Sequence, residues 1–130
     1  MVAYAAAALG GALGALARWG VAEALPSDAG GWPWATLLVN LTGCLLLGLL
    51  LGRVVPRFPD ATWPRPFLVT GLLGGFTTFS AFALETVQLT EGGHPGAAAG
   101  YVLASVAGGI AAAALGTRAG RAATPRVPAP

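Results

Sequence analysis

The stretch that decides the fold is GLLGGFTTFSAFALETVQLT, residues 71–90, within an apolar segment long enough to cross a bilayer. It carries the pair Gly74-Gly75, followed by three hydroxyl residues: Thr77, Thr78 and Ser80. A simple anchor does not need this pattern, because glycine lowers helix stability by about 1 kcal/mol relative to alanine. In lipid, backbone groups that the glycines free need partners within protein or a water-filled cavity. The stretch therefore predicts a membrane helix that is broken in the middle, at Gly74-Gly75, and builds an ion site there.

The composition indicates a membrane protein. Hydrophobic residues make up 55% of the chain and charged residues only 9%, whereas a soluble domain carries about a quarter charged residues. The seven basic residues are all arginine and the net charge is only +2, which gives no support to nucleic-acid binding. No nucleophile with a base, phosphate-binding loop or cluster of metal ligands occurs in the sequence, so we expect no enzyme.

Four segments meet the requirement of about 20 apolar residues per crossing. They are residues 3–25, 34–55, 67–90 and 96–117. We therefore predict an all-α membrane protein in which residues 1–117 form one four-span transmembrane domain. The remaining residues, 118–130, are rich in Ala, Pro and Arg and predict a disordered cytoplasmic tail.

The arginines predict the orientation of the spans. With four crossings, one side receives six arginines: Arg53, Arg57, Arg65, Arg118, Arg121 and Arg126. The loops of the opposite side contain Asp28, Glu91 and His94 but no arginine. The positive-inside rule then places both termini in the cytoplasm.

Pairs of glycines at four-residue spacing recur along the chain and favour close helix packing in lipid. The pairs are Gly10 with Gly14, Gly48 with Gly52, Gly71 with Gly75, and Gly96 with Gly100. Because glycine and alanine are abundant, we expect at least half of these spacings to arise by chance. Four short spans enclose little space, so an oligomer is the natural way to build a pathway.

Two polar residues of the first two spans allow alternative interpretations. Arg18 either extends to the membrane interface or raises the anion concentration at a pore mouth. Asn40, the one asparagine of the chain, either donates to an anion or forms an interhelical hydrogen bond. Gly43 lies three residues further on and clears space on the same face.

The third span offers both kinds of ion ligand if its helix breaks. Carbonyls at the end of the first half suit a small cation, and N–H groups at the start of the second half suit an anion. Phe79 and Phe82 share a face, and their ring edges carry partial positive charge. Glu85 is expected off the main path or near its mouth. Tyr101, in the fourth span, either completes a polar track or packs.

Three motifs together resemble the small bacterial fluoride channel family, Fluc, also called CrcB. They are Gly10-Gly11-x-x-Gly14-Ala15-x-x-Arg18, Thr36-Leu37-x-Val39-Asn40-x-x-Gly43, and Gly71-x-x-Gly74-Gly75-x-Thr77-Thr78-Phe79-Ser80-x-Phe82. The resemblance covers nearly the whole chain apart from the tail. It implies a fluoride channel in the bacterial plasma (inner) membrane, built as an antiparallel dimer with two pores and a structural sodium ion at the dimer interface.

The resemblance also implies roles for individual residues. Backbone carbonyls of Gly74 and Thr77 from each subunit would bind the sodium ion. Fluoride would pass the two phenylalanines and a series of polar groups: Asn40, Thr78, Phe79, Ser80, Phe82 and Tyr101. Ala81 departs from the family, which usually has threonine there, and this puts any role of that side chain in doubt.

The arginine asymmetry is a second departure, because an antiparallel homodimer needs one sequence that inserts in both orientations. We therefore hypothesise that this chain pairs with an inverted, differently charged homologous subunit. The implied function is passive export of fluoride, which enters the cell as HF and ionises there, so that its toxicity falls. One alternative is a small four-span proton-coupled multidrug exporter, which would need a carboxylate at the centre of the first span. Another is a structural membrane scaffold, which would not need Asn40 and the hydroxyl cluster.

Overall fold

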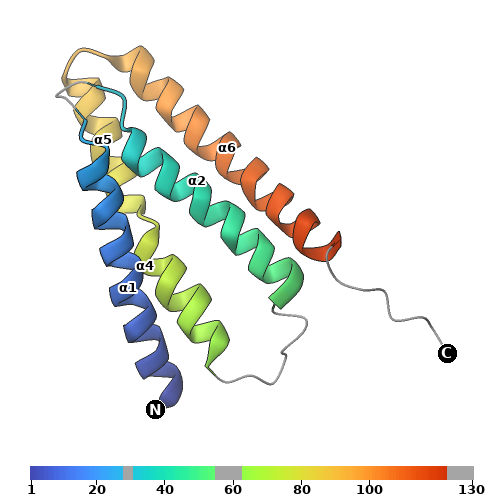
Figure 1. Ribbon diagram of the computed structural model, residues 1–130. Helices are drawn as coiled ribbons and strands as arrows, with labels where there is room; N and C mark the ends of the chain where they lie inside the picture. Colours follow the sequence, from blue (N-terminus) through green and yellow to red (C-terminus); the bar gives the residue numbers. More distant parts are fainter. Residues whose placement is uncertain (28–30, 55–62, 123–130) are drawn as a thin grey trace.

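The computed structural model describes residues 1–27, 31–54 and 63–122, and the regular structure in these ranges is helical. The elements are α1 (Val2–Ala24), α2 (Trp34–Leu49), the π-helical turn η1 (Leu50–Val54), the π-helical segment η2 (Pro66–Leu73), α4 (Gly74–Phe76), α5 (Phe79–Glu91) and α6 (Pro95–Ala122). The start of α1 and the end of α6 lie at the same end of the helical bundle (Figure 1).

Four helical segments are long and apolar enough to cross a membrane: Val2–Ala24, Trp34–Arg53, Pro66–Glu91 and Pro95–Ala122. This confirms the predicted all-α chain with four spans. The fourth span continues beyond Thr117 to Ala122, so residues 118–122, which we assigned to a disordered tail, are helical. Alanine and arginine are good helix formers, which accounts for the extension. The predicted tail residues 123–130 and the loop residues Asp28 and Arg57 lie outside the described ranges.

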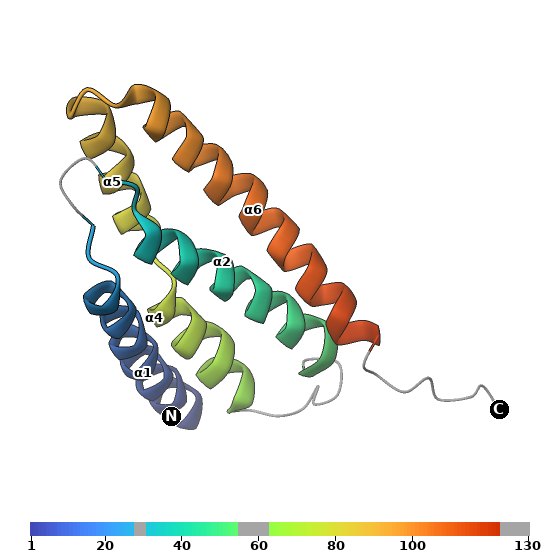
Figure 2. The same ribbon diagram turned by 45° about the horizontal axis from the view of Figure 1, so that its top comes forward.

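The first span packs against the first half of the third span through glycines on both helices (Figure 2). A Cβ added to Gly14 would collide with the backbone of Leu72, and one added to Gly75 would collide with the backbone of Gly11. Only glycine allows two helix backbones to approach so closely in lipid. We call this contact the first glycine interface, formed by Gly10, Gly14, Gly71 and Gly75.

A second glycine interface joins the second span to the fourth. It is formed by Gly48, Gly52, Gly116 and Gly120, each of which would meet the opposite backbone with an added Cβ. Three of the four predicted glycine pairs therefore lie at close helix contacts, and the expectation that at least half arise by chance is wrong. The pair Gly96 and Gly100 differs, because Gly96 has nothing within 4 Å of an added Cβ.

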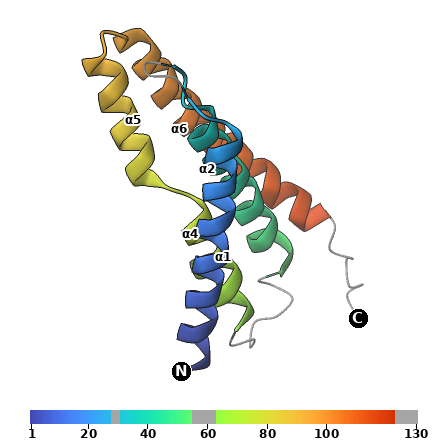
Figure 3. The ribbon, with the colours of Figure 1, turned by 60° about the vertical axis from the view of Figure 1, so that its left-hand side comes forward.

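A small side-chain core lies where α2, α5 and α6 meet, near the start of α6. Its buried members are Leu37, Leu89, Ala98 and Tyr101. Tyr101 is completely buried, and the Trp32 ring packs edge-on against it with ring centroids 5.9 Å apart. Figure 3 shows that α5 leaves the direction of α4 and runs toward the start of α6. The turn between α4 and α5 therefore positions the residues discussed next.

Candidate functional site

Two residues of the third span, Thr77 and Thr78, have extended backbone conformations between α4 and α5. Their φ and ψ angles are −78° and 157° for Thr77 and −147° and 120° for Thr78. The helix was expected to break at Gly74-Gly75, but both glycines are helical, so this location is wrong. The reason is tertiary, because Gly75 lies against Gly11 in the first glycine interface and serves close packing rather than a turn.

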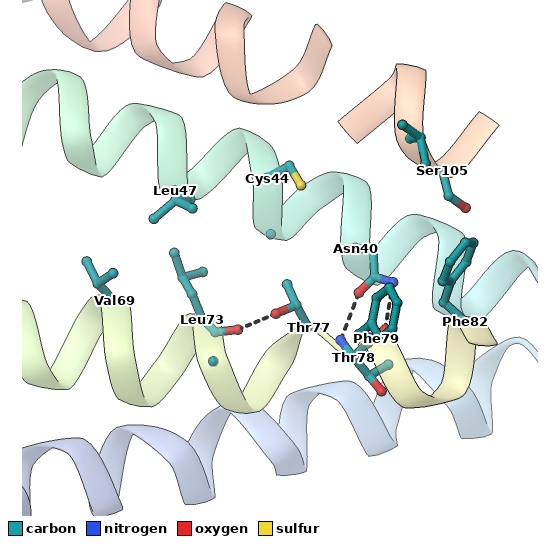
Figure 4. A pocket seen from close by; sticks show the side chains of 13 residues that line it. Asn40, Cys44, Leu47, Val69, Leu73, Thr77, Thr78, Phe79, Phe82 and Ser105 are labelled. Atoms are coloured by element: carbon teal, nitrogen blue, oxygen red, sulfur yellow. Dashed lines mark hydrogen bonds between the residues drawn. The ribbon is translucent and has the colours of Figure 1, made fainter. Parts of the chain in front are cut away.

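Asn40 of α2 holds the extended residue Thr78 through both ends of its amide. The Thr78 N–H donates to Asn40 Oδ1 at 2.8 Å, and Asn40 Nδ2 donates to the Thr78 carbonyl at 2.9 Å (Figure 4). These bonds replace the helical partners that an extended residue loses, which matters in a medium without water. Gly43 permits the contact, because an added Cβ would collide with the Thr77 side chain. The interhelical role considered for Asn40 is thus present, and the amide has a second hydrogen that can donate.

The second half of the span begins with its own cap. The Thr78 side chain accepts a bond from the Ala81 N–H at 3.2 Å and lies 3.2 Å from the Ser80 hydroxyl. Thr77 instead donates its hydroxyl back to the Leu73 carbonyl at 2.9 Å. The predicted hydroxyl cluster therefore stabilises the start of α5 and the end of α4, which is the usual work of Ser and Thr beside a helix terminus.

A cavity of about 440 Å³ lies between α2, the third span and α6. Figure 4 shows its wall, on which Phe79 lies beside Asn40 and Phe82 lies below Ser105. The two phenylalanine rings are 5.7 Å apart between centroids, and Phe79 is 80% exposed. The lining is mostly apolar, with polar groups from four residues: Asn40, Thr77, Thr78 and Ser105.

Ser105 was not among the residues predicted for the site. Its hydroxyl is buried in the cavity wall and has no hydrogen-bond partner within the described part of the chain. The sequence held one signal, since Ser105 follows Tyr101 by four residues and so lies on the same face of a helix. An isolated serine in an apolar helix usually donates to a carbonyl one turn earlier, so this signal alone did not assign Ser105 to the site.

Glu85 connects three helices through its carboxylate. The Thr36 hydroxyl of α2 donates to Oε1 at 2.6 Å, and the Tyr101 hydroxyl of α6 donates to Oε2 at 2.6 Å. Phe82 packs on Tyr101, with ring centroids 5.4 Å apart, so this group adjoins the cavity. Glu85 and Tyr101 are not among the residues that line the larger cavity. The contact among Thr36, Glu85 and Tyr101 could not be predicted from the sequence, because the three residues lie on separate helices.

Arg18 lies beside the end of α4. Its Nε–H donates to the Gly75 carbonyl at 3.1 Å, and its side chain is half-buried. A cation near carbonyls at a helix C-terminus is electrostatically favourable. Arg18, Thr36, Thr78, Ala81 and Glu85 also line a second, smaller cavity of about 180 Å³. Arg18 thus has a structural partner in the Gly75 carbonyl. Because it also lines this cavity, a role at a pore mouth stays a prediction.

The residues predicted to bind sodium occupy the end of α4. The Thr78 N–H, which would donate to the Gly74 carbonyl in a continuous helix, donates to Asn40 instead. Likewise, the Ala81 N–H, the helical donor to the Thr77 carbonyl, bonds to the Thr78 side chain. Both carbonyls are therefore relieved of their helical donors, which suits ligands of a hard cation. Among the described residues, no group of three His, Cys, Asp or Glu side chains is placed to bind a metal.

Comparison with known proteins identifies the family. Residues 5–117 match the family model described as CrcB-like protein, Camphor Resistance (CrcB). A relative from Paracoccus denitrificans, named Fluoride-specific ion channel FluC, is 50% identical over 114 residues, covering 88% of this chain and 90% of the relative. The Fluoride-specific ion channel FluC 1 of Mycolicibacterium paratuberculosis is 44% identical over 109 residues, covering 84% and 83% of the two chains. The chain therefore belongs to the CrcB-like family.

Proposed function

We propose that this protein is a fluoride-specific ion channel that gives passive export of fluoride from the cytoplasm. The observation that carries the proposal is the cavity beside Thr77 and Thr78, where donors from two helices and two phenylalanine edges surround a space in the middle of the spans. The names of the relatives, fluoride-specific ion channels at 44% to 50% identity, agree with it. This activity is transport rather than catalysis.

The lining accounts for how a dehydrated anion would be accommodated. Asn40 has a second amide hydrogen that can donate, and the Ser105 hydroxyl has no partner among the described residues. Ring edges of Phe79 and Phe82 carry partial positive charge. Thr78 and Ser80 add hydroxyls at the start of α5, whereas the Tyr101 hydroxyl donates to Glu85 and its ring packs on Phe82. Such donors replace water around a small anion without binding it tightly, which conduction requires.

We infer that the third span acts as a discontinuous helix within an antiparallel dimer. Phe79 is 80% exposed, and Gly74 and Ser80 are exposed in the middle of a span, where lipid would leave polar groups without partners. A second subunit that covers this surface would complete the wall of the cavity. Backbone carbonyls of Gly74 and Thr77 would hold a structural sodium ion there, and the ion would supply fixed positive charge beside the anion path.

The chain is proposed to lie in the bacterial plasma (inner) membrane with both termini in the cytoplasm. The support is that Arg53, Arg65, Arg118 and Arg121 lie at one end of the bundle. This asymmetry also supports pairing with an inverted homologous subunit of different charge. Mapping the termini of the chain expressed alone tests the pairing. Equal populations of both orientations, with full fluoride transport, would contradict it.

The channel function is tested by fluoride efflux from liposomes, recorded with a fluoride electrode. Phe79→Ile and Phe82→Ile should each reduce efflux by at least about tenfold, equivalent to about 1.4 kcal/mol, because an aliphatic side chain lacks the positive ring edge. Phe67→Ile is the matched control, since Phe67 lies on η2 outside the cavity lining. Unchanged efflux in both pore variants would count against the site.

The same liposomes separate channel and exporter. A proton-coupled exporter would transport its drug only with a pH gradient, whereas a channel passes fluoride without one. The charged residues of α1 are Arg18 and Glu23, both in the second half of the helix, so its centre carries no carboxylate, which disfavours the exporter. A scaffold would show neither activity.

A further inference from the structure

The second glycine interface brings arginines of two helices together at one end of the bundle. A Cβ added to Gly52 would lie 3.2 Å from the backbone nitrogen of Arg121, and one added to Gly120 would lie 3.1 Å from that of Arg53. Each arginine therefore directly follows the glycine at which the two backbones meet. Arg118 lies one turn before Arg121 on α6, and all three side chains are exposed. We call Arg53, Arg118 and Arg121 the arginine cluster.

The lengths of the two helices place this cluster at the depth of lipid headgroups. The α2–η1 span, Trp34–Arg53, has 20 residues and ends at Arg53 itself. Helix α6 has 28 residues, roughly 42 Å at 1.5 Å per residue, against about 30 Å for the hydrocarbon core. Because charged side chains avoid hydrocarbon, the end of α6 that carries Arg118 and Arg121 is the end expected to reach beyond it, to the layer that contains phosphates.

The charges around the cluster favour an anion. The carboxylates within the described residues are Glu23, Glu85 and Glu91; Glu23 and Glu91 lie at the ends of α1 and α5, away from the arginines (Figure 1). Arg53 already takes part in an interaction within the chain, so we assign it no direct bond to the anion; it adds positive charge to the cluster. The direct donors are Arg118 and Arg121, whose guanidinium groups match the geometry of phosphate oxygens.

We propose that the arginine cluster binds the phosphate of an anionic phospholipid headgroup, of the phosphatidylglycerol class, beside the junction of η1 and α6. The ordinary roles of these arginines, to orient the spans and to stabilise the end of α6, require no bound lipid. The site is separate from the cavity, and its existence does not depend on fluoride transport or on which leaflet it faces.

Native mass spectrometry of the full chain in a neutral detergent tests the proposal, with phosphatidylglycerol and phosphatidylcholine added in parallel. The protein should retain phosphatidylglycerol in preference to phosphatidylcholine. Arg118→Gln and Arg121→Gln should each weaken that retention by about fivefold, from the attraction that each surface arginine contributes. Arg65→Gln is the control, because it removes an equal charge from an exposed position at the same end of the bundle. Arg121→Lys keeps the charge and should retain more lipid than Arg121→Gln.

Three outcomes would overturn the proposal. One is equal retention of the two lipids by the unmodified chain. Another is an equal loss in Arg65→Gln, which would show diffuse surface charge rather than a site. The third comes from a thermal unfolding arm: inorganic phosphate alone should not raise the melting temperature as phosphatidylglycerol does, and an equal rise would indicate free phosphate as the ligand. Unfolding of each variant without lipid verifies that the altered chain is folded.

Discussion

The two halves of the third span are held in opposite ways. The first half, η2 with α4, lies against α1 through glycines, so that backbone contacts backbone. The second half, α5, begins with the exposed Phe79 and is held by side-chain hydrogen bonds to other helices. Asn40 of α2 binds Thr78 at its start, and its own Glu85 accepts bonds from Thr36 and Tyr101 further along. Glycine contact gives a rigid, closely fitted support, whereas side-chain bonds leave space between the helices. The candidate site lies in the half of the span that is held by side-chain hydrogen bonds, next to the half that is held by glycine contacts.

The largest effect is expected from disturbing the glycine contact. Gly14→Ala adds a Cβ that would collide with the Leu72 carbonyl and lie 2.7 Å from the Phe76 nitrogen. Backbone atoms cannot turn aside as a flexible side chain can, so we expect a loss of about 3 kcal/mol in stability. Thermal unfolding in detergent measures it.

Gly20→Ala is the matched control on the same helix, because an added Cβ there has nothing within 4 Å. Alanine should stabilise that position by up to about 1 kcal/mol. Equal behaviour of the two variants would contradict the rigid first interface.

An intermediate effect is expected from removing the side-chain support of Thr78. Asn40→Ala leaves the Thr78 N–H and carbonyl without their partner, and we expect a loss of about 2 kcal/mol with reduced fluoride efflux. Asn40→Asp keeps an acceptor for the Thr78 N–H but no donor for the Thr78 carbonyl, so fluoride efflux should fall in this variant as well. Thr42→Ala, at an exposed position of α2, should leave both unfolding and efflux unchanged. Were Asn40→Ala to match Thr42→Ala in unfolding, the amide would not be supporting the turn.

The smallest effect on stability is expected in the cavity wall. Ser105→Ala should not lower stability and should raise it slightly, because it removes a buried hydroxyl that has no partner among the described residues. Efflux should nevertheless fall, because the variant lacks one hydroxyl donor of the cavity wall. Tyr101→Phe, one turn away, removes the hydroxyl that donates a hydrogen bond to Glu85, and the protein should lose about 1 kcal/mol of stability. Paired unfolding and efflux measurements on both variants distinguish a free hydroxyl from a structural one, and a larger stability loss in Ser105→Ala would reverse this assignment.

Much of the architecture was predictable because it depends on local properties of the sequence. The four spans follow from runs of apolar residues, and Trp34 and Trp63 lie at span ends as indole rings prefer. The glycine pairs predicted close packing but not which helices would meet. The break was predicted three residues too early, at Gly74-Gly75 instead of Thr77-Thr78. A glycine pair is typical both of a helix break and of a close helix contact, and the sequence does not show which helix packs against it.

The sequence by itself determined the membrane class, the four helical spans, the end that carries the arginines and the motifs of the CrcB-like family. These features depend on composition and short spacings, which need no knowledge of the fold. Only the tertiary structure decided that Gly75 packs on Gly11, that Asn40 holds Thr78 and that Glu85 accepts bonds from Thr36 and Tyr101. It also decided that the Ser105 hydroxyl lies in the cavity wall without a partner among the residues that the structure describes. The physical reason is that each of these contacts joins helices far apart in sequence, so their existence depends on which helices become neighbours.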